Sequence, residues 1–517
     1  MKVLFALLVL TFLVVSLIKE RMRPGLILLS GAVIFLCSGI ITPKEMLEGF
    51  SNKGMITVAL LFLVSEGIRR SGLLGSLVHR LLPTGQGIST RRVQWRMLPT
   101  VSFISAFLNN TPVVVIFAPI IKRWADAHGV AATKLLIPLS YATILGGVCT
   151  LIGTSTNLVI DGLVTDAGYR GFSMFELGKV GVFIAICGLL YLWLFSDKLL
   201  PSARPEQADF DSTDAEVQGM KRVEVVLGAR FPAINRRIID FDFKQKYGAL
   251  LIALKRGGKT LIMHDMRHEV FREGDTLVLL TGDDFMTNWG DSSFFLMVSD
   301  GEASKSTLSP TKKVLAVVLP ALMVAGATIG ELPAFKAAFP GLRVDMFTCA
   351  AVVTILMAWL QMFPARKYTK FISWDILVTI ASAFAISRAM QNSGLADAVA
   401  SFAVGLSHSY SPEVLLAVVF IVTNLFTELM TNNAAAALAF PLSLAIAQHL
   451  GVSPTPFFVT ICMAASASFS TPIGYQTNLI VQGVGNYRFA DFVRIGLPLN
   501  ILCLVITVLI VPLIWPF

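Results

Sequence analysis

The sequence predicts a polytopic α-helical membrane protein: two inverted repeats of five transmembrane helices each plus a re-entrant hairpin, with a small α+β insert between the repeats. Three observations predict this fold class, namely recurring apolar segments, polar motifs that return at a fixed spacing, and one long polar stretch near mid-chain. Of the 517 residues, 55% are hydrophobic and 15% are charged, whereas soluble domains carry roughly 25% charged residues. The composition therefore favours a membrane protein.

Apolar segments that approach or reach the length of a membrane span occur in both halves of the chain. They lie at 3–18, 25–41, 180–195, 314–327, 346–359 and 495–514. A helix needs about 20 apolar residues to cross a bilayer. The first segment resembles the apolar part of a signal peptide, but no small-residue cleavage pattern follows it, so we expect it to remain as a helix.

Cysteine usage and charge exclude several other classes. All six cysteines fall in expected spans without a CxxC pair, which favours buried thiols over disulfides or metal ligands. The net charge of +9 is explained largely by loops on one side of the membrane, so it does not indicate nucleic-acid binding. No HExxH, Ser/His/Asp or paired-carboxylate pattern supports an enzyme.

The chain contains an internal repeat. The motif at 108–120 reads LNNTPVVVIFAPI and returns at 430–442 as MTNNAAAALAFPL. Downstream, TLIGTSTNLVIDG at 150–162 returns as STPIGYQTNLIVQG at 470–483, and upstream RSGLLGSLV at 70–78 returns as NSGLADAVA at 392–400. Because all three pairs keep a spacing of 321 or 322 residues, we predict repeats at 1–201 and 312–517 around an insert at 202–311.

Each repeat is expected to have three spans, a re-entrant hairpin and two further spans, with hairpins at about 96–123 and 413–447. Five crossings is an odd number, so the second repeat must lie upside down relative to the first. Most Lys and Arg then fall on one side of the membrane, and none occurs between 389 and 487. The positive-inside rule therefore places the first hairpin and the insert in the cytoplasm of a cell (inner) membrane protein, with both termini and the second hairpin outside. Inverted repeats with broken helices are a transporter architecture.

The asparagines at the centre of each hairpin are the candidate functional residues. A buried amide costs free energy unless its donors and acceptors are satisfied, and the plain alternative is hydrogen bonding between helices. Two clusters in equivalent positions, each paired with a Gly-containing break, favour a functional role. Helix breaks expose carbonyls that suit Na⁺ and helix N-terminal N–H groups that suit anions.

These motifs, NNT with GTSTN and TNN with PIGYQTN, resemble the divalent anion:sodium symporter family of the ion transporter superfamily. The resemblance implies an elevator-type homodimer that carries Na⁺ and a small divalent anion, without an organic cofactor. It implies one sodium site at Ser105, Asn109, Asn110 and Gly153, and another at Thr427, Asn432 and Gly474. It implies an anion site at Asn110, Thr111, Thr154, Asn432 and Asn433.

The chain departs from the family pattern at several positions. Asn109 stands where the family has Ser, and 431–433 reads Thr-Asn-Asn in place of Ser-Asn-Thr. Dicarboxylate members carry prolines where this chain has 155–156 and 475–477. The segments TNNAAAALAFP and TPIGYQTNLIV are more similar to the sulfate-transporter branch. We therefore predict Na⁺-coupled sulfate symport, with a C4-dicarboxylate or a sulfonate as the alternative substrate, H⁺ as an alternative coupling ion, and a ligand-gated channel as a further alternative.

Several charged residues are expected inside or near the membrane. Glu66, Arg69 and Arg70 form one group, and Asp375 and Arg388 lie in the matching region of the second repeat. Such residues pair locally or take part in ion coupling, and the sequence leaves both open. Glu428, beside Thr427, either orients the hairpin by hydrogen bonding or binds a proton or cation.

Residues 202–311 differ in character from the two membrane repeats. A polar linker at 201–216 precedes β-like runs at 223–227, 248–254, 260–264, 276–280 and 294–298, and RGG at 256–258 predicts a hairpin turn. The pattern GALLIALKRGG…FREGDTLVLLTG resembles the C-terminal lobe of TrkA-type (RCK) regulator domains. The resemblance implies a module that dimerises and binds a small regulatory ligand; a passive packing domain is the alternative. The insert has no GxGxxG motif, which argues against a dinucleotide.

Overall fold

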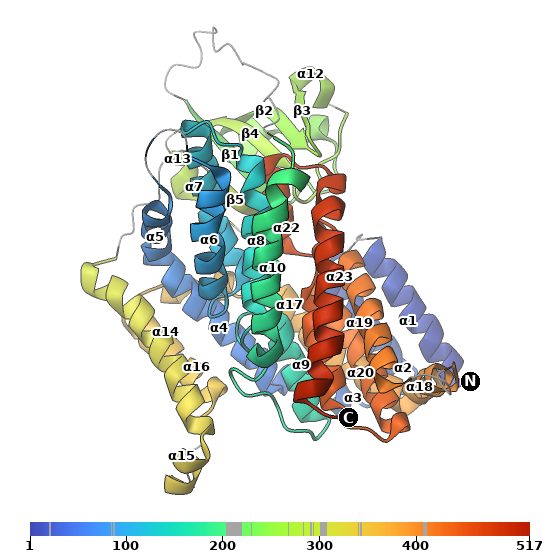
Figure 1. Cartoon of the computed structure of the whole chain (residues 1–517). Coiled ribbons are helices and arrows are strands. Elements are labelled where there is room, and N and C mark those ends of the chain that lie inside the picture. The colour runs from blue at the N-terminus through green and yellow to red at the C-terminus, as the bar shows by residue number, and fades with distance from the viewer. Residues whose placement is uncertain are drawn as a thin grey trace.

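The computed structural model describes residues 1–19, 22–83, 85, 88–202, 220–228, 230–266, 268–282, 284–289, 292, 294–299, 308–339, 341, 344–406 and 411–517. Among these residues, helices from both halves of the chain pack into one body, and a small sheet lies against one end of it (Figure 1). The predicted fold class, a helical membrane protein with a small α+β insert, is confirmed.

The first half of the chain supplies the helices up to α10. They are α1 (Lys2–Ile18), α2 (Pro24–Cys37), α3 (Pro43–Glu48), η1 (Gly49–Ser51), α4 (Lys53–Arg70), α5 (Leu73–Leu81), α6 (Thr90–Ser105), α7 (Asn110–Ala127), η2 (Ala132–Lys134), α8 (Leu136–Gly147), α9 (Ser155–Asp166) and α10 (Gly178–Leu199).

The second half supplies the helices from α14 onward. They are α14 (Pro310–Glu331), α15 (Pro333–Ala338), α16 (Met346–Trp359), η5 (Ala365–Phe371), α17 (Trp374–Ser393), α18 (Leu395–Leu406), α19 (Pro412–Leu429), α20 (Asn432–Leu450), α21 (Thr455–Ser466), α22 (Gln476–Gly485) and α23 (Phe489–Ile514).

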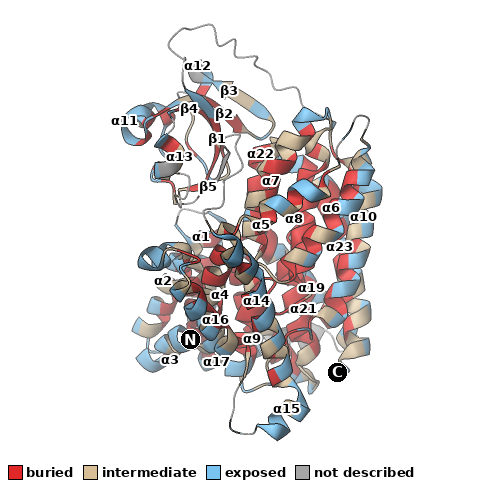
Figure 2. Cartoon of the chain, turned by 90° about the vertical axis from the view of Figure 1, so that its left-hand side faces the viewer, coloured by how far each residue is buried: buried red, intermediate tan, exposed pale blue. Residues whose placement is uncertain are grey.

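Two hairpins and two broken spans repeat in the same order. Hairpin α6–α7 breaks at 106–109 and is followed by the broken span α8–α9, whereas α19–α20 breaks at 430–431 and is followed by α21–α22. The first hairpin lies in the half of the molecule beside the sheet and the second in the opposite half (Figure 1). The view turned by 90° agrees (Figure 2). This is the arrangement that inverted repeats require, and both chain ends lie away from the sheet.

Helix length alone identifies fewer spans than the ten crossings that the sequence predicts. Among the described helices, six are long and apolar enough to cross a membrane, or seven if the bent pair η5–α17 counts as one span. The broken spans α8–α9 and α21–α22 escape this count because each is interrupted near its middle. The hairpin arms α19 and α20 are included in the count because each is long and apolar enough by itself.

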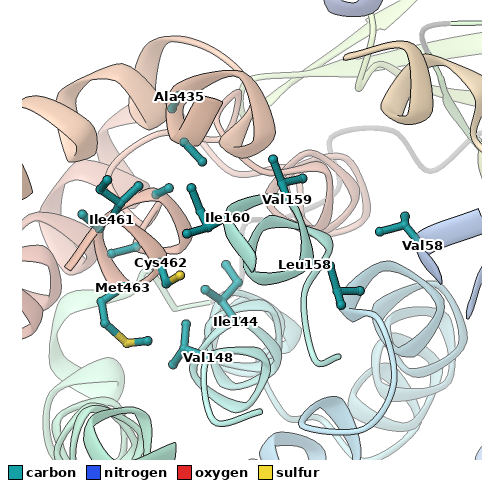
Figure 3. Packing of buried hydrophobic residues seen from close by; sticks show 14 of the residues in the cluster. Val58, Ile144, Val148, Leu158, Val159, Ile160, Ala435, Ile461, Cys462 and Met463 are labelled. Carbon is teal, nitrogen blue, oxygen red and sulfur yellow. The ribbon is translucent and has the colours of Figure 1, made fainter. Parts of the chain in front are cut away.

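The innermost helices are buried on all sides. Every residue of α8, and every residue of α21 after Thr455, is buried, whereas the outer helices α10, α14 and α23 expose apolar side chains, as surfaces that face lipid do (Figure 2). Ile144, Ile160 and Cys462, from α8, α9 and α21, pack together and are at most 1% exposed (Figure 3). The two repeats therefore share one apolar core.

The cysteine prediction needs one correction. All six cysteines are free thiols, as predicted, but only Cys462 and Cys503 are buried. Cys37 is exposed and the other three are partly exposed.

The insert is a five-stranded antiparallel sheet with strand order β3-β2-β4-β1-β5. The strands are β1 (Lys221–Leu227), β2 (Ala249–Arg256), β3 (Lys259–Ile262), β4 (Thr276–Thr281) and β5 (Phe295–Ser299), and the short helices are η4 (Ile238–Asp240), α11 (Phe243–Tyr247), α12 (Met263–Met266) and α13 (Asp284–Trp289). Gly257 and Gly258 join β2 to β3 with φ of +56° and +83°, which confirms the predicted turn because a tight hairpin needs positive φ at both central positions.

The sheet docks on the ends of α7 and α22. Lys122 Nζ of α7 lies 3.0 Å from Glu224 Oε2 of β1, and Gly258 N donates to Asn486 Oδ1, just after α22, at 2.8 Å. A side chain at Gly483 of α22 would meet Thr276 Oγ1 of β4 at 2.5 Å, so no gap separates helix and sheet there. The insert is thus attached to one arm of the first hairpin and to one broken span of the second repeat.

Candidate functional site

Four helices begin at chain breaks and meet in one region of the molecule. They are α7, α9, α20 and α22, which start at Asn110, Ser155, Asn432 and Gln476. The first N–H groups of a helix have no partner inside the helix, and its N-terminus carries a partial positive charge. Four such ends provide N–H donors and a positive potential without a single formal charge.

Hydrogen bonds across the two repeats join these helix ends. Thr111 Oγ1 of α7 donates to Gln476 Oε1 of α22 at 3.3 Å. In the reciprocal contact, Ser155 Oγ and Thr156 Oγ1 of α9 donate to Asn433 Oδ1 of α20 at 3.3 and 3.2 Å. Each hairpin tip therefore contacts the broken span of the other repeat.

In the first repeat, the hairpin tip packs against the break after α8. Ser105 Oγ donates to Asn110 Oδ1 at 2.6 Å. Thr150 Oγ1 donates to Ala106 O across the break, and Gly153 N donates to Thr150 Oγ1 at 3.1 Å. A polar hydroxyl–amide pair thus lies beside main-chain carbonyls that have left the helix.

The second repeat reproduces these bonds. Thr427 Oγ1 donates to Asn432 Oδ1 at 2.8 Å. Thr471 Oγ1 donates to Glu428 O at 3.0 Å, and Gly474 N donates to Thr471 Oγ1 at 3.2 Å. The duplication that the sequence predicts is therefore present at the level of individual hydrogen bonds.

The glycines of the two breaks are required by close backbone approach. A Cβ atom at Gly153 would lie 2.5 Å from Gly147 O, and one at Gly474 would lie 2.5 Å from Thr427 O. Real Cβ atoms do not approach oxygen that closely. Glycine at 153 lets the first loop lie directly against the end of α8, and glycine at 474 lets the second loop lie directly against the end of α19.

These two half-sites have the chemistry of Na⁺ sites. Na⁺ is a hard cation that is bound by carbonyl, hydroxyl and amide oxygens. Asn110 and Asn432, only 1% and 7% exposed, direct their Oδ1 atoms toward the hydroxyls of Ser105 and Thr427. Turning those hydroxyl hydrogens away would leave the hydroxyl oxygen and the amide oxygen of each pair free to bind a cation.

The structure brings together all but one of the predicted site residues. Thr111, Thr154 and Asn433 join the cluster through bonds to the opposite repeat. Asn109 does not, since within the described chain its side chain makes no hydrogen bond. It lies at the wall of an apolar cavity of about 710 Å³ that is lined by α4, α5, α9, α14 and the first hairpin, and that Ser155 of the cluster also borders.

Two residues of the cluster were missed as site residues by the sequence reasoning. Tyr475 OH accepts from Asn110 Nδ2 at 2.5 Å and lies 3.3 Å from Thr154 Oγ1. Gln476 bonds Thr111. In the sequence both stand out only as departures from the family pattern. Their alignment with Thr154 and Ser155, 321 residues earlier, was the signal that could have identified them.

The charged residues singled out by the sequence lie outside this cluster in local pairs. Glu66 Oε2 lies 2.7 Å from Arg69 Nε and Glu66 Oε1 lies 2.5 Å from Arg70 Nε. Arg388 Nη2 lies 3.1 Å from Asp166 Oδ2, and Asp375 Oδ1 accepts from Gly25 N at 3.2 Å. The geometry fits the local-pairing alternative.

Glu428 borders the second half-site and organises its loop. Its Oε1 accepts from Phe469 N at 3.0 Å, from Ser470 N at 2.7 Å and from Asn500 Nδ2 at 2.7 Å. These bonds hold the break after α21 against α19 and α23. They fit the alternative in which Glu428 orients the hairpin.

Comparisons with known proteins bear on the whole chain. The family model described as "Citrate transporter" (CitMHS) matches residues 13–442 and 342–516. An uncharacterized transporter of Synechocystis sp. is 30% identical, over 94% of this chain and 92% of that protein. Sodium/sulfate cotransporter 2 of Chlamydomonas reinhardtii is 23% identical, over 90% and 84%. The sodium-dependent dicarboxylate transporter SdcS of Staphylococcus saprophyticus is 22% identical, over 91% and 78%.

A solved structure supports the fold. The YdaH transporter of Alcanivorax borkumensis, whose crystal structure is described as revealing an unusual topology, superposes with a TM-score of 0.51. It covers 90% of this chain and 86% of its own, at 14% sequence identity. At that identity the likeness concerns the fold alone.

Proposed function

The chain belongs to the citrate transporter family (CitMHS), and we propose that within it this protein is a Na⁺-coupled symporter of a small divalent oxyanion, namely sulfate. It is a membrane transporter and not an enzyme, and its relatives include sodium-coupled carriers of sulfate and of dicarboxylates. This agrees with the resemblance to the divalent anion:sodium symporter family. The observation that carries the proposal is the meeting of four helix N-termini between two duplicated hydroxyl–amide pairs.

The anion binds between the hairpin tips in this proposal. Thr111, Asn432 and Asn433, together with the first N–H groups of the four helices, supply donors to its oxygens. Helix N-termini are ready-made anion sites because their N–H groups and dipoles point toward the ligand. Each end contributes about 0.3–1 kcal/mol at an exposed surface and more where it is partly buried, so four ends together bind a divalent anion without arginine.

Sodium coupling follows from the cost of an uncompensated charge. A lone ion buried away from water costs several kcal/mol even after the protein relaxes. Na⁺ at Ser105, Asn110 and Gly153 and Na⁺ at Thr427, Asn432 and Gly474 would balance the two charges of the anion. A site that holds only the anion, or only Na⁺, carries a net charge, and its movement through the membrane is unfavourable. A site that holds two Na⁺ ions and the divalent anion is close to neutral and can move.

The mechanism that fits this arrangement is elevator-type alternating access in a homodimer. The helices that carry the site, α6–α9 and α19–α22, would move together against the others. In this proposal the insert lies in the cytoplasm and both termini lie outside. The separation of the chain ends from the sheet supports that topology (Figure 1).

A C4-dicarboxylate is the second candidate substrate. Similarity to a sodium-dependent dicarboxylate transporter over 91% of this chain favours it. The absence of proline from 155–156 and 475–477 disfavours it, because the departures there match the sulfate-transporter branch.

The insert is proposed to regulate transport and to bind a small ligand. Its contacts with α7 and α22 support this role, since both helices begin in the site and end at the sheet. Removal of 210–305 is expected to change the transport rate or its regulation without changing which anion is carried. A changed anion preference would mean that the insert contributes to the site.

Uptake into proteoliposomes tests the function. We expect radiolabelled sulfate to accumulate only with an inward Na⁺ gradient and without inhibition by excess succinate. Asn110→Ala and Asn432→Ala should each abolish uptake. Asn392→Ala is the matched control, because that amide bonds Ile40 O and Glu45 far from the site, and it should transport normally. Wild-type uptake by either site variant would refute the site, and succinate uptake without sulfate uptake would establish the second candidate.

A further inference from the structure

One pair of equivalent residues in the site differs greatly in size between the two repeats. Thr154 precedes α9 and Tyr475 precedes α22 at equivalent positions of the two repeats, 321 residues apart. Their backbones have the same conformation, with φ and ψ of −139° and 145° at Thr154 and −135° and 132° at Tyr475. At this pair of positions the two repeats therefore differ in the side chain alone: a small hydroxyl in the first repeat and a phenol in the second.

Thr154 caps the helix that follows it, whereas Tyr475 does not. Thr154 caps its own helix, with Oγ1 accepting from Thr156 N at 3.4 Å, whereas the side chain of Tyr475 makes no cap bond to α22. A capping side chain is worth about 0.5–2 kcal/mol. A tyrosine at this position thus lacks an available stabilisation, which indicates that its side chain acts elsewhere.

That side chain crosses to the first repeat and covers its amide. Tyr475 OH lies 2.5 Å from Asn110 Nδ2 and 3.3 Å from Thr154 Oγ1. Both ends of the Asn110 amide are then engaged, because Oδ1 already accepts from Ser105. In the second half-site Asn432 Oδ1 is bonded by Thr427, and its Nδ2 has no partner among the described residues. The phenol therefore takes one of the two side-chain N–H groups of Asn110, whereas both side-chain N–H groups of Asn432 are available to the anion.

We propose that Tyr475 sets the upper size limit of the transported anion, by filling the first half-site with its ring and confining the anion to the space beside α20 and α22. This inference rests on the proposed anion site. A single tetrahedral centre such as sulfate needs donors around one point. A C4-dicarboxylate or citrate carries carboxylates separated by a carbon chain, and its second carboxylate would need the volume that the phenol occupies.

The ring and the hydroxyl have separable roles. The ring excludes long anions by its volume, since an aromatic side chain occupies far more space than threonine and a close-packed site cannot accommodate both ring and ligand. The hydroxyl bonds Asn110 and so holds the ring in position. Tyr475→Thr copies the residue that the first repeat already uses, so the backbone should tolerate it. Tyr475→Phe keeps the ring and removes only the hydroxyl.

The test is a size series of divalent and trivalent anions, comprising sulfate, malonate, succinate, glutarate and citrate. Uptake by purified wild-type protein and both variants is measured in proteoliposomes with a Na⁺ gradient. One methylene in a pocket changes kcat/KM by about 10- to 200-fold. We therefore expect Tyr475→Thr to raise the kcat/KM ratio of succinate to sulfate by at least about tenfold. Tyr475→Phe should lower kcat/KM while keeping the wild-type order of anions.

The outcomes separate this inference from the proposed function. If the wild type carries no sulfate but carries another anion of the series, the sulfate proposal fails. Tyr475→Thr must then still extend the upper limit to the next longer anions. An unchanged size order in Tyr475→Thr, with normal folding by thermal unfolding and gel filtration, would overturn the role of Tyr475. An equal extension in Tyr475→Phe would overturn the role of the ring, and so would efficient citrate transport by the wild type.

Discussion

Reversing the charge of Lys122 should release the insert from the first hairpin. Glu224 of β1 accepts from Lys122 Nζ of α7 and from Lys255 Nζ of β2, each at 3.0 Å. All three side chains are mostly buried, with exposed fractions of 17%, 19% and 5% respectively. Lys122→Glu replaces an attraction across the docking surface by a repulsion and leaves the Glu224–Lys255 pair within the sheet in place.

The magnitude follows from the pKa of Glu224. Burial by itself would raise this pKa, but the two lysines lower it from 4.5 to about 2. That fall corresponds to about 3 kcal/mol in favour of the charged carboxylate. If the two lysines share it equally, Lys122 contributes roughly 1–2 kcal/mol, and a repulsion of similar size brings the cost of charge reversal to about 3 kcal/mol. The docked form should then lose about a hundredfold in its equilibrium with the undocked form.

Hydrogen–deuterium exchange on the purified protein measures this change. We expect faster exchange in β1 and at the sheet-facing ends of α7 and α22, with the strands of the sheet still protected. Lys336→Glu is the matched control, because it makes the same charge change in α15, at the end of the molecule opposite the sheet (Figure 1). A double-mutant cycle of Lys122→Gln and Glu224→Gln isolates the pair. Additive effects in that cycle, or exchange in Lys122→Glu identical to wild type, would refute the ion pair as a docking contact.

Four further predictions concern the site and the insert. Gly474→Ala should raise the Na⁺ concentration needed for half-maximal uptake at least tenfold, because its Cβ would lie 2.5 Å from Thr427 O; unchanged Na⁺ dependence would separate this loop from the cation site. Glu428→Ala should lower the unfolding temperature by leaving two main-chain N–H donors without an acceptor, at about 1–3 kcal/mol each, whereas Glu428→Gln should keep them bonded; equal losses would contradict the orienting role. Arg256→Ala should unfold the insert, since removing one partner of a buried ion pair costs about 3–5 kcal/mol, and proteolysis of the sheet with intact helices would confirm this. Because the pKa of Glu224 is lowered in the folded protein to about 2, docking through this pair should be complete above about pH 4.5 and be lost as the pH falls toward 2; exchange in β1 that stays constant over this range would contradict the assignment.

Much of the fold could be predicted from the sequence because it depends on local rules. A low charge content and long apolar segments indicate that the chain is embedded in a lipid bilayer. The constant spacing between motifs identifies a duplication, and an odd number of crossings makes that duplication inverted. The five strands of the insert and the Gly257–Gly258 turn also follow from local pattern, since alternation and positive φ are properties of short segments.

The pairing within each hairpin could likewise be predicted. Ser105 and Asn110, or Thr427 and Asn432, are five residues apart on either side of a helix break, so a short loop suffices to bring them together. The motifs contain no arginine, so the predicted anion site consists of amides, hydroxyls and helix ends.

Contacts between distant segments were decided only by the tertiary structure. Pattern gives no indication that Tyr475 reaches Asn110, 365 residues away, or that Asn109 lies against an apolar cavity instead of joining its neighbour. Such contacts depend on how two separately folded repeats face each other, which no local propensity encodes. The docking of Glu224 on Lys122 is of the same kind. The sequence by itself determined the membrane environment, the duplication and the chemistry of the motifs, whereas packing between the repeats determined which side chains of the two motifs meet.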